Sequence, residues 1–89
     1  MSETKYTCIK TGDKVKINGT ISLKIDGLSF SGNFNTLENK YCGDFVYTEK
    51  EGKVSVSINN TTSEIISDCH EFLLQVIKEA KLTLINKEF

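Results

Sequence analysis

The chain has 89 residues, 38% of them hydrophobic, and a formal net charge of −1. A chain of this length forms one small domain, so we expect a single domain over residues 1–89. The small net charge excludes a strong electrostatic field for nucleic acid, and the absence of arginine removes the side chain best suited to bidentate contacts with phosphate.

Apolar residues recur at every second position in the first two thirds of the chain, which predicts strands between about residues 5 and 58. Asn18-Gly19 and Asp26-Gly27 are residue pairs that favour two-residue hairpin turns, because the central residues of such turns need positive φ. A further hairpin is expected across residues 49–52. The sequence therefore predicts consecutive antiparallel strands.

Two interruptions are expected within this region. Gly32 indicates a bulge or a bend in the strand after the Asp26-Gly27 turn. Residues 35–42 are polar and irregular, so we expect a loop there.

The hydrophobic period changes near residue 60. From Ile65 onward apolar residues recur every third or fourth position, which predicts one long helix over residues 62–82. Thr61 and Glu64 have the spacing of a capping box at its start. Residues 82–86 alternate in polarity, so they fit either the end of the helix or an edge strand.

These elements predict an α+β fold: an antiparallel β-sheet of four to six strands, joined as hairpins or a meander, with a single long C-terminal α-helix packed on one face. The positions that share the buried side of each element predict the core. The predicted core residues are Val15, Ile17, Ile21, Leu23, Ile25, Phe30, Val54, Val56, Ile58, Ile66, Cys69, Phe72, Leu73 and Val76.

The sequence predicts neither a catalytic site nor a metal site. Cys69 and His70 are adjacent, but neighbouring residues of a helix do not face each other. Cys69 also lies in the apolar stripe, which favours a buried, inert thiol. Cys8, Cys42 and Cys69 lack the short spacing that characterises zinc ligands. We therefore expect no enzymatic activity and no cofactor.

Lysines gather in the first strands. Lys10, Lys14, Lys16 and Lys24, with Tyr6 nearby, suggest a surface for single-stranded nucleic acid. In outline, antiparallel strands followed by a C-terminal helix, the chain resembles the PC4-like single-stranded-DNA-binding proteins, and this resemblance implies a nucleic-acid-binding module. The alternative is that these lysines are solvated and guard strand edges.

Two leucines of the predicted helix fall outside its apolar stripe. Leu74 and Leu82, with Lys78 between them, define a candidate partner-binding surface on the outer side of the helix, and an edge strand of the sheet is the alternative surface. A core this small also favours a homodimer. We therefore expect a small non-catalytic protein that binds or inhibits another protein, with single-stranded nucleic-acid binding as the less favoured alternative.

Location and source are also expectations. The first residues lack the basic and apolar regions of a signal peptide, no apolar run reaches the length of a membrane helix, and three cysteines fit a reducing compartment. We expect a cytoplasmic protein with no membrane partner. All eleven basic residues are lysine and proline is absent, a composition typical of AT-rich genomes such as those of low-GC bacteria and their phages. Phage-encoded anti-defence and immunity proteins fit this description.

Overall fold

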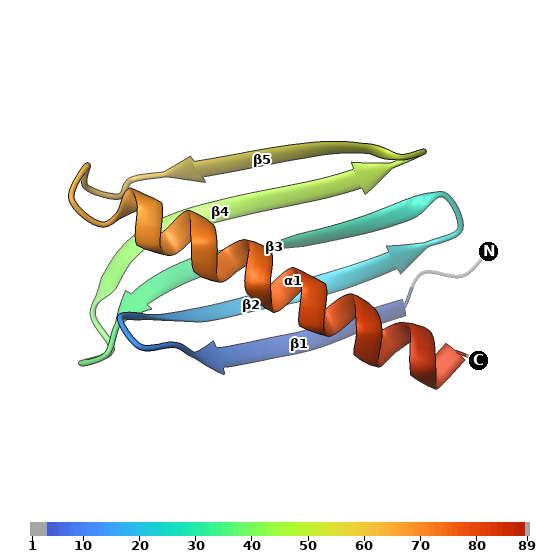
Figure 1. The fold of residues 1–89 in the computed structure, drawn as a ribbon, viewed down its shortest axis with the longest axis horizontal. Helices are drawn as coiled ribbons and strands as arrows, with labels where there is room; N and C mark the ends of the chain where they lie inside the picture. The colour runs from blue at the N-terminus through green and yellow to red at the C-terminus, as the bar shows by residue number, and fades with distance from the viewer. Residues whose placement is uncertain (1–3, 89) are drawn as a thin grey trace.

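The structure is a computed structural model that describes residues 4–88, with side-chain surroundings described through residue 83. The described residues form a five-stranded sheet and one helix: β1 (Thr4–Thr11), β2 (Val15–Lys24), β3 (Gly27–Thr36), β4 (Tyr41–Lys50), β5 (Lys53–Asn59) and α1 (Ile66–Glu88). Each strand pairs antiparallel with the next in the chain. The sheet is therefore a meander, and α1 crosses one of its faces diagonally (Figure 1). The predicted α+β fold is confirmed.

The predicted turn at Asn18-Gly19 is wrong, because β2 continues straight through both residues. Gly19 lies opposite Gly32 of β3. A Cβ atom at Gly19 would lie 2.5 Å from the carbonyl oxygen of Ser31 and 2.8 Å from the ring of Phe30. The glycine is therefore needed for the close approach of neighbouring groups, and not for a turn.

Two predictions about β3 and its connection to β4 are also wrong. The β2–β3 register runs unbroken past Gly32, and the irregularity lies between β3 and β4, at Phe34/Asn35. The predicted loop over residues 35–42 is largely strand, and only residues 37–40 connect β3 to β4. Asn39 supports this turn with a φ of 70°, a left-handed conformation that asparagine tolerates.

The other hairpins lie close to their predicted positions. The β2–β3 turn occupies Ile25 and Asp26, one residue earlier than predicted, because Lys24 pairs with Gly27. Ile25 is fully exposed in this turn, so its place in the predicted core is wrong. The β4–β5 turn is Glu51-Gly52, with φ values of 53° and 83°, as a type I′ turn requires.

The helix begins at Ile66, later than predicted. The carbonyl of Thr62, and not that of Thr61, accepts the N–H of Ile66 at 3.1 Å, and the hydroxyl of Thr61 lies 4.0 Å from Cys69 Sγ, so the predicted capping box is wrong. At the other end, residues 82–86 belong to α1. The alternating pattern there is part of the helix and not an edge strand.

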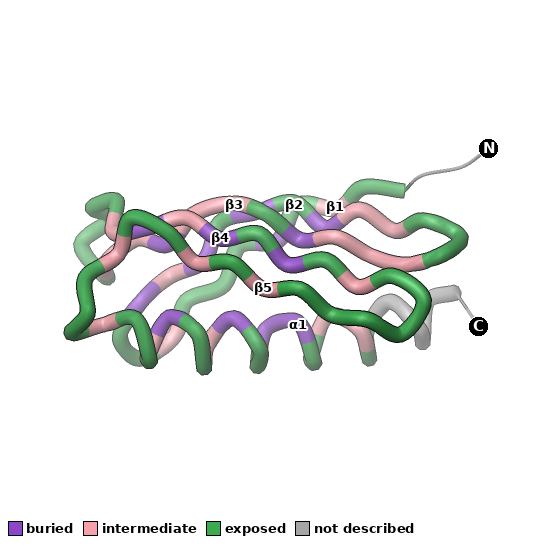
Figure 2. The backbone as a smooth tube through the Cα atoms, turned by 90° about the horizontal axis from the view of Figure 1, so that it is seen from above, coloured by how far each residue is buried: buried purple, intermediate pink, exposed green. Residues whose placement is uncertain are grey.

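The core lies between the sheet and α1, as the buried segments of both layers in Figure 2 show. Its centre is aromatic: the ring of Phe45 lies 4.8 Å from that of Phe30 and 5.1 Å from that of Phe34, between centroids. Gly19 leaves space for the ring of Phe45, because a Cβ atom there would lie 3.0 Å from it. The buried hydrophobic residues are Cys8, Val15, Ile17, Ile21, Phe30, Phe34, Phe45, Tyr47, Cys69, Leu73, Val76 and Ile77.

Two further residues of the predicted core are exposed. Val54 is 55% exposed and Ile66 is 40% exposed. Both point to the correct side of their element, but because the helix crosses the sheet diagonally, the opposite layer leaves each of them partly uncovered. Val56 and Ile58 are half-buried for the same reason. Strand β5 is therefore the least covered part of the apolar face.

Leu73 and Leu74 offer a matched test of the packing, because they are adjacent in α1 but 0% and 41% exposed. We expect Leu73→Ala to lower the free energy of unfolding by about 2–5 kcal/mol, the cost of lost burial plus a cavity. Leu74→Ala should cost much less. Urea denaturation of both variants measures the difference, and equal losses would contradict the packing described here.

Candidate functional site

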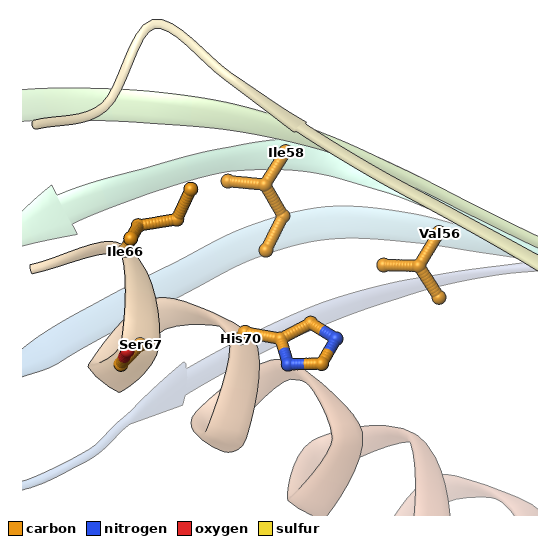
Figure 3. A pocket seen from close by; sticks show the side chains of 5 residues that line it. All are labelled: Val56, Ile58, Ile66, Ser67 and His70. Atoms are coloured by element: carbon orange, nitrogen blue, oxygen red, sulfur yellow. The ribbon is translucent and has the colours of Figure 1, made fainter. Parts of the chain in front are cut away.

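One flank of α1 faces β5 across an open groove. Ile66, Ser67 and His70 of the helix and Val56 and Ile58 of the strand line a cavity of about 330 Å³ (Figure 3). We call this space the β5 groove. It exists because α1 starts near the end of β5 and then turns away across the sheet (Figure 1). Its walls are mixed: Val56, Ile58 and Ile66 are apolar, Ser67 is polar, and the imidazole of His70 lies between helix and strand.

A second hollow continues along the same flank. Leu74, Ile77, Lys78, Lys81 and Leu82 line it from the helix, and Tyr47 lines it from β4; its volume is about 340 Å³. We call it the Leu74 hollow. The two spaces share a flank because residues 67, 70, 74, 78 and 81, which line them, fall within an arc of about 80° on a helix of 3.6 residues per turn.

Exposed apolar side chains accompany both spaces. Leu74 is 41% exposed and Leu82 is 59% exposed beside the hollow, while Val54 and Ile66 are exposed at β5 and the groove. Ile9, Ile25 and Val46 are exposed elsewhere, but on this flank the exposed apolar residues border two hollows, and apolar surface gathered at a groove is typical of binding sites. This flank is therefore the candidate functional site.

A charged cluster borders the Leu74 hollow. Lys81 donates a hydrogen bond of 2.6 Å to Glu49 Oε1, and the hydroxyl of Tyr47 donates one of 3.0 Å to the same oxygen. Hydrogen bonds from Lys81 and Tyr47 lower the pKa of Glu49. Burial, together with the Glu49 carboxylate, raises the pKa of Tyr47 to about 12. The cluster ties α1 to β4 and leaves the hollow with a neutralised Lys81.

The structure brings the three predicted partner-binding residues together. Leu74, Lys78 and Leu82 all line the same hollow. Sequence reasoning missed Tyr47, which completes the hollow from the sheet. The sequence does contain a feature that could have placed Tyr47. If the hairpin is counted back from the two-residue turn at Glu51-Gly52, Tyr47 lies opposite Val56 on the inner face of the sheet.

The residues predicted for nucleic acid do not share a surface. Tyr6 and Lys10 lie on the inner face of β1, near α1. Lys14 lies in the β1–β2 turn, and its Nζ is 3.5 Å from the carboxylate of Asp68. Lys16 and Lys24 lie on the outer face, eight positions apart in β2, roughly 26 Å.

The thiols lie apart from this flank or are buried. Cys69 is 0% exposed, and burial raises the pKa of its thiol, as it does for Cys42 beside it. His70 points into the β5 groove instead (Figure 3). Cys69 and His70 therefore do not form a nucleophile and base. Among the described residues, no three metal-binding side chains gather at one place.

The part of the chain that the structure describes contains no helix with both the length and the apolar character needed to cross a membrane. Comparisons with protein-family models, curated proteins and solved structures found no match. The functional argument therefore rests on the geometry of this chain.

Glu49 gives a testable dependence on pH. A carboxylate with a lowered pKa stabilises the fold above its ordinary pKa, here 4.5, and this contribution is lost as the pH falls through the lowered value. We expect Glu49→Gln to reduce stability at neutral pH by about 0.2–1 kcal/mol and to flatten the loss of stability below pH 4.5. Urea denaturation between about pH 3 and 7 measures both effects.

Glu38 is the matched control, since it is exposed in the β3–β4 turn, away from α1. Glu38→Gln should leave the acid side of the stability curve close to that of the parent. If the two glutamine variants behaved alike, the Glu49 cluster would not contribute to stability.

Proposed function

We propose that this protein is a small, non-catalytic protein-binding protein that occupies a surface of another protein through the Leu74 hollow. One observation carries the proposal: Leu74, Lys78 and Leu82 line one hollow with exposed apolar walls. A hollow of about 340 Å³ accommodates an apolar side chain of a partner, and burying such a side chain contributes about 1.5–3 kcal/mol.

The charges beside the hollow specify the chemistry of the partner. Lys81 is paired with Glu49 at 2.6 Å, whereas Lys78 has no ion-pair partner among the described residues. A partner with an apolar side chain next to a carboxylate would therefore fill the hollow with the first and pair with Lys78 through the second. We propose that the partner presents such a pair of residues.

The mode of action follows from the same surface. A protein that blocks its partner by occupying a surface needs no reactive group, and the buried Cys69 thiol with its raised pKa supports a non-catalytic role. The lysine-rich, arginine-free composition supports a source in a low-GC bacterium or its phages. Our proposal includes action in the cytoplasm, as an anti-defence or immunity protein.

Leu74→Asp tests the proposal, and Leu37→Asp is the control. Both leucines are 41% exposed, but Leu37 lies in the β3–β4 turn, away from the Leu74 hollow. We expect a protein that the parent and Leu37→Asp both capture from nuclease-treated bacterial lysate to be lost with Leu74→Asp, because a carboxylate at the hollow repels an acidic partner and resists burial. Mass spectrometry of the captured proteins gives the result.

Circular dichroism should show that both variants remain folded. A partner that Leu74→Asp captures as well as the parent does would contradict binding at the Leu74 hollow. If Leu74→Asp captured every protein as well as the parent does, the proposed function would be wrong.

The outer face of the sheet supports a second candidate, single-stranded nucleic-acid binding. Lys24, Lys50 and Lys53 lie in one row across it, because Gly27 pairs with both Lys24 and Lys50, and Lys50 pairs with Lys53. Lys5 and Lys16 share this face, and Asp44 is the carboxylate on its strands. We rank this candidate second because Tyr41 is the aromatic residue available there for stacking on bases.

Salt dependence separates the two candidates. If the outer face binds single-stranded DNA, its affinity should fall about 10- to 100-fold between about 50 and 200 mM salt, since a few phosphate contacts release counterions. Replacing Lys24 and Lys53 by glutamine should weaken binding, whereas Lys78→Gln on the helix should not. Anisotropy of a labelled oligonucleotide measures this, and no binding at low salt would eliminate the candidate.

A further inference from the structure

The free edge of β5 carries unpaired backbone groups at particular residues. Among residues 4–88, β5 pairs with β4 alone. The two-residue turn Glu51-Gly52 makes Lys50 and Lys53 a hydrogen-bonded pair, and in an antiparallel ladder hydrogen-bonded and non-hydrogen-bonded pairs alternate. The residues whose N–H and C=O groups point toward the free edge are therefore Val54, Val56 and Ile58.

The same three residues present their side chains on the inner face. Val54 lies opposite Glu49, Val56 opposite Tyr47 and Ile58 opposite Phe45. The helix covers these three residues incompletely, and Val56 and Ile58 form the strand wall of the β5 groove (Figure 3). One segment therefore offers both hydrogen-bonding groups and apolar surface to a strand placed beside it.

This segment is complementary to itself. In an antiparallel pair centred on Val56, Val54 lies opposite Ile58, Ser55 opposite Ser57, and Lys53 opposite Asn59. Apolar residues then face apolar residues on the inner side, and hydroxyl groups face hydroxyl groups on the outer side. The N–H and C=O groups that Val54, Val56 and Ile58 direct to the free edge all gain hydrogen-bonded partners in this register. If the pair were centred on Ser55 instead, Ile58 would have no strand residue opposite it.

We propose that two copies of this chain form a two-fold symmetric dimer in which their β5 strands pair antiparallel, with Val56 opposite the partner's Val56. The five-stranded sheets then join into one sheet, with both helices on the same side. The β5 groove becomes the space between the two helices and is closed by apolar residues from both copies. This inference does not depend on the proposed function of the Leu74 hollow.

The dimensions of the molecule suit such a dimer. The side that carries β5 spans the longest and shortest axes of the molecule, 39 Å and 18 Å, an area of about 700 Å². Standard protein–protein interfaces bury about 800 Å² per partner. This outline is the largest area that the side can offer, and it lies in the lower part of the range of roughly 600–1,000 Å² per partner found for standard interfaces.

The opposite edge is less suited to pairing. β1 carries two lysines, Lys5 and Lys10, and charged side chains on an edge strand oppose pairing. The C-terminal half of α1 also passes over β1 (Figure 1), and Tyr6 and Cys8 pack against the core. The charge on β5 is Lys53, at its first residue. In the dimer Lys53 lies roughly 20 Å from the partner's Lys53.

Light scattering of the purified full chain tests the proposal, with Val56→Lys as the disrupting variant and Val46→Lys as its control. Val46 lies on the outer face of β4, away from the edge, and is 46% exposed. We expect the parent and Val46→Lys to have twice the 10.0 kDa mass of the chain, and Val56→Lys to be monomeric. A monomeric parent at high concentration, or a dimer unaffected by Val56→Lys, would overturn the proposal.

Disulfide cross-linking tests the register and does not rely on a destabilising variant. Val56→Cys places the new thiol opposite its own copy, about 5.5 Å apart between Cα atoms, within the range of a disulfide. Val54→Cys places the thiol opposite the partner's Ile58 instead, too far from its own copy. Under a mild disulfide oxidant we expect Val56→Cys to form the intermolecular disulfide and Val54→Cys not to, with the parent as the background for the native cysteines.

The two proposals fail separately. Equal cross-linking of Val54→Cys and Val56→Cys would overturn the register and with it this dimer. The test of partner binding at the Leu74 hollow is independent of the dimer, because Leu74→Asp leaves β5 unchanged. A dimer that persists while Leu74→Asp captures every partner would remove only the proposed function.

Discussion

A single helix about 10 Å wide covers a sheet whose five strands, about 4.8 Å apart, extend roughly 19 Å across. The helix therefore cannot bury the whole apolar face. It lies diagonally, so that Cys69, Leu73 and Val76 fill the centre, while the two outer strands are partly uncovered. The rings of Phe30, Phe34 and Phe45 make the centre dense, and both spaces on the β5 flank result from the incomplete cover.

The period of the apolar residues is enough to predict the fold class, because strands and helices bury side chains at different intervals. The turns were harder to place. Asn18-Gly19 satisfies the local requirement for a type I′ turn, but Gly19 is needed where Phe30 and Ser31 of the next strand approach it. A local signal and a tertiary requirement select the same residue, and the sequence alone does not distinguish them.

The candidate site was predictable on the helix and not on the sheet. Spacing along a helix determines which residues share a flank, so Leu74, Lys78 and Leu82 could be grouped from the sequence. Their neighbour Tyr47 depends on where the helix crosses the sheet, which is a property of the tertiary packing. Ile66 and Val54 were predicted to be buried for the same reason: the sequence identifies the apolar side of each element but not how much of it the other layer covers.

The geometry of the β4–β5 hairpin connects the backbone and the side chains of the free edge. A two-residue turn requires its flanking pair to be hydrogen-bonded, so every second residue after it has its backbone groups directed away from β4. In β5 these are also the residues that face the helix, namely Val54, Val56 and Ile58. Had the turn been one residue longer, Val54 would lie opposite Lys50, and Val54, Val56 and Ile58 would turn to the outer face. In the hairpin as it stands, a strand that pairs with β5 would both cover the exposed valines and form hydrogen bonds with the free N–H and C=O groups. A helix docked in the β5 groove would cover the side chains but leave the edge unpaired, so an extended segment satisfies this surface better than a helix does.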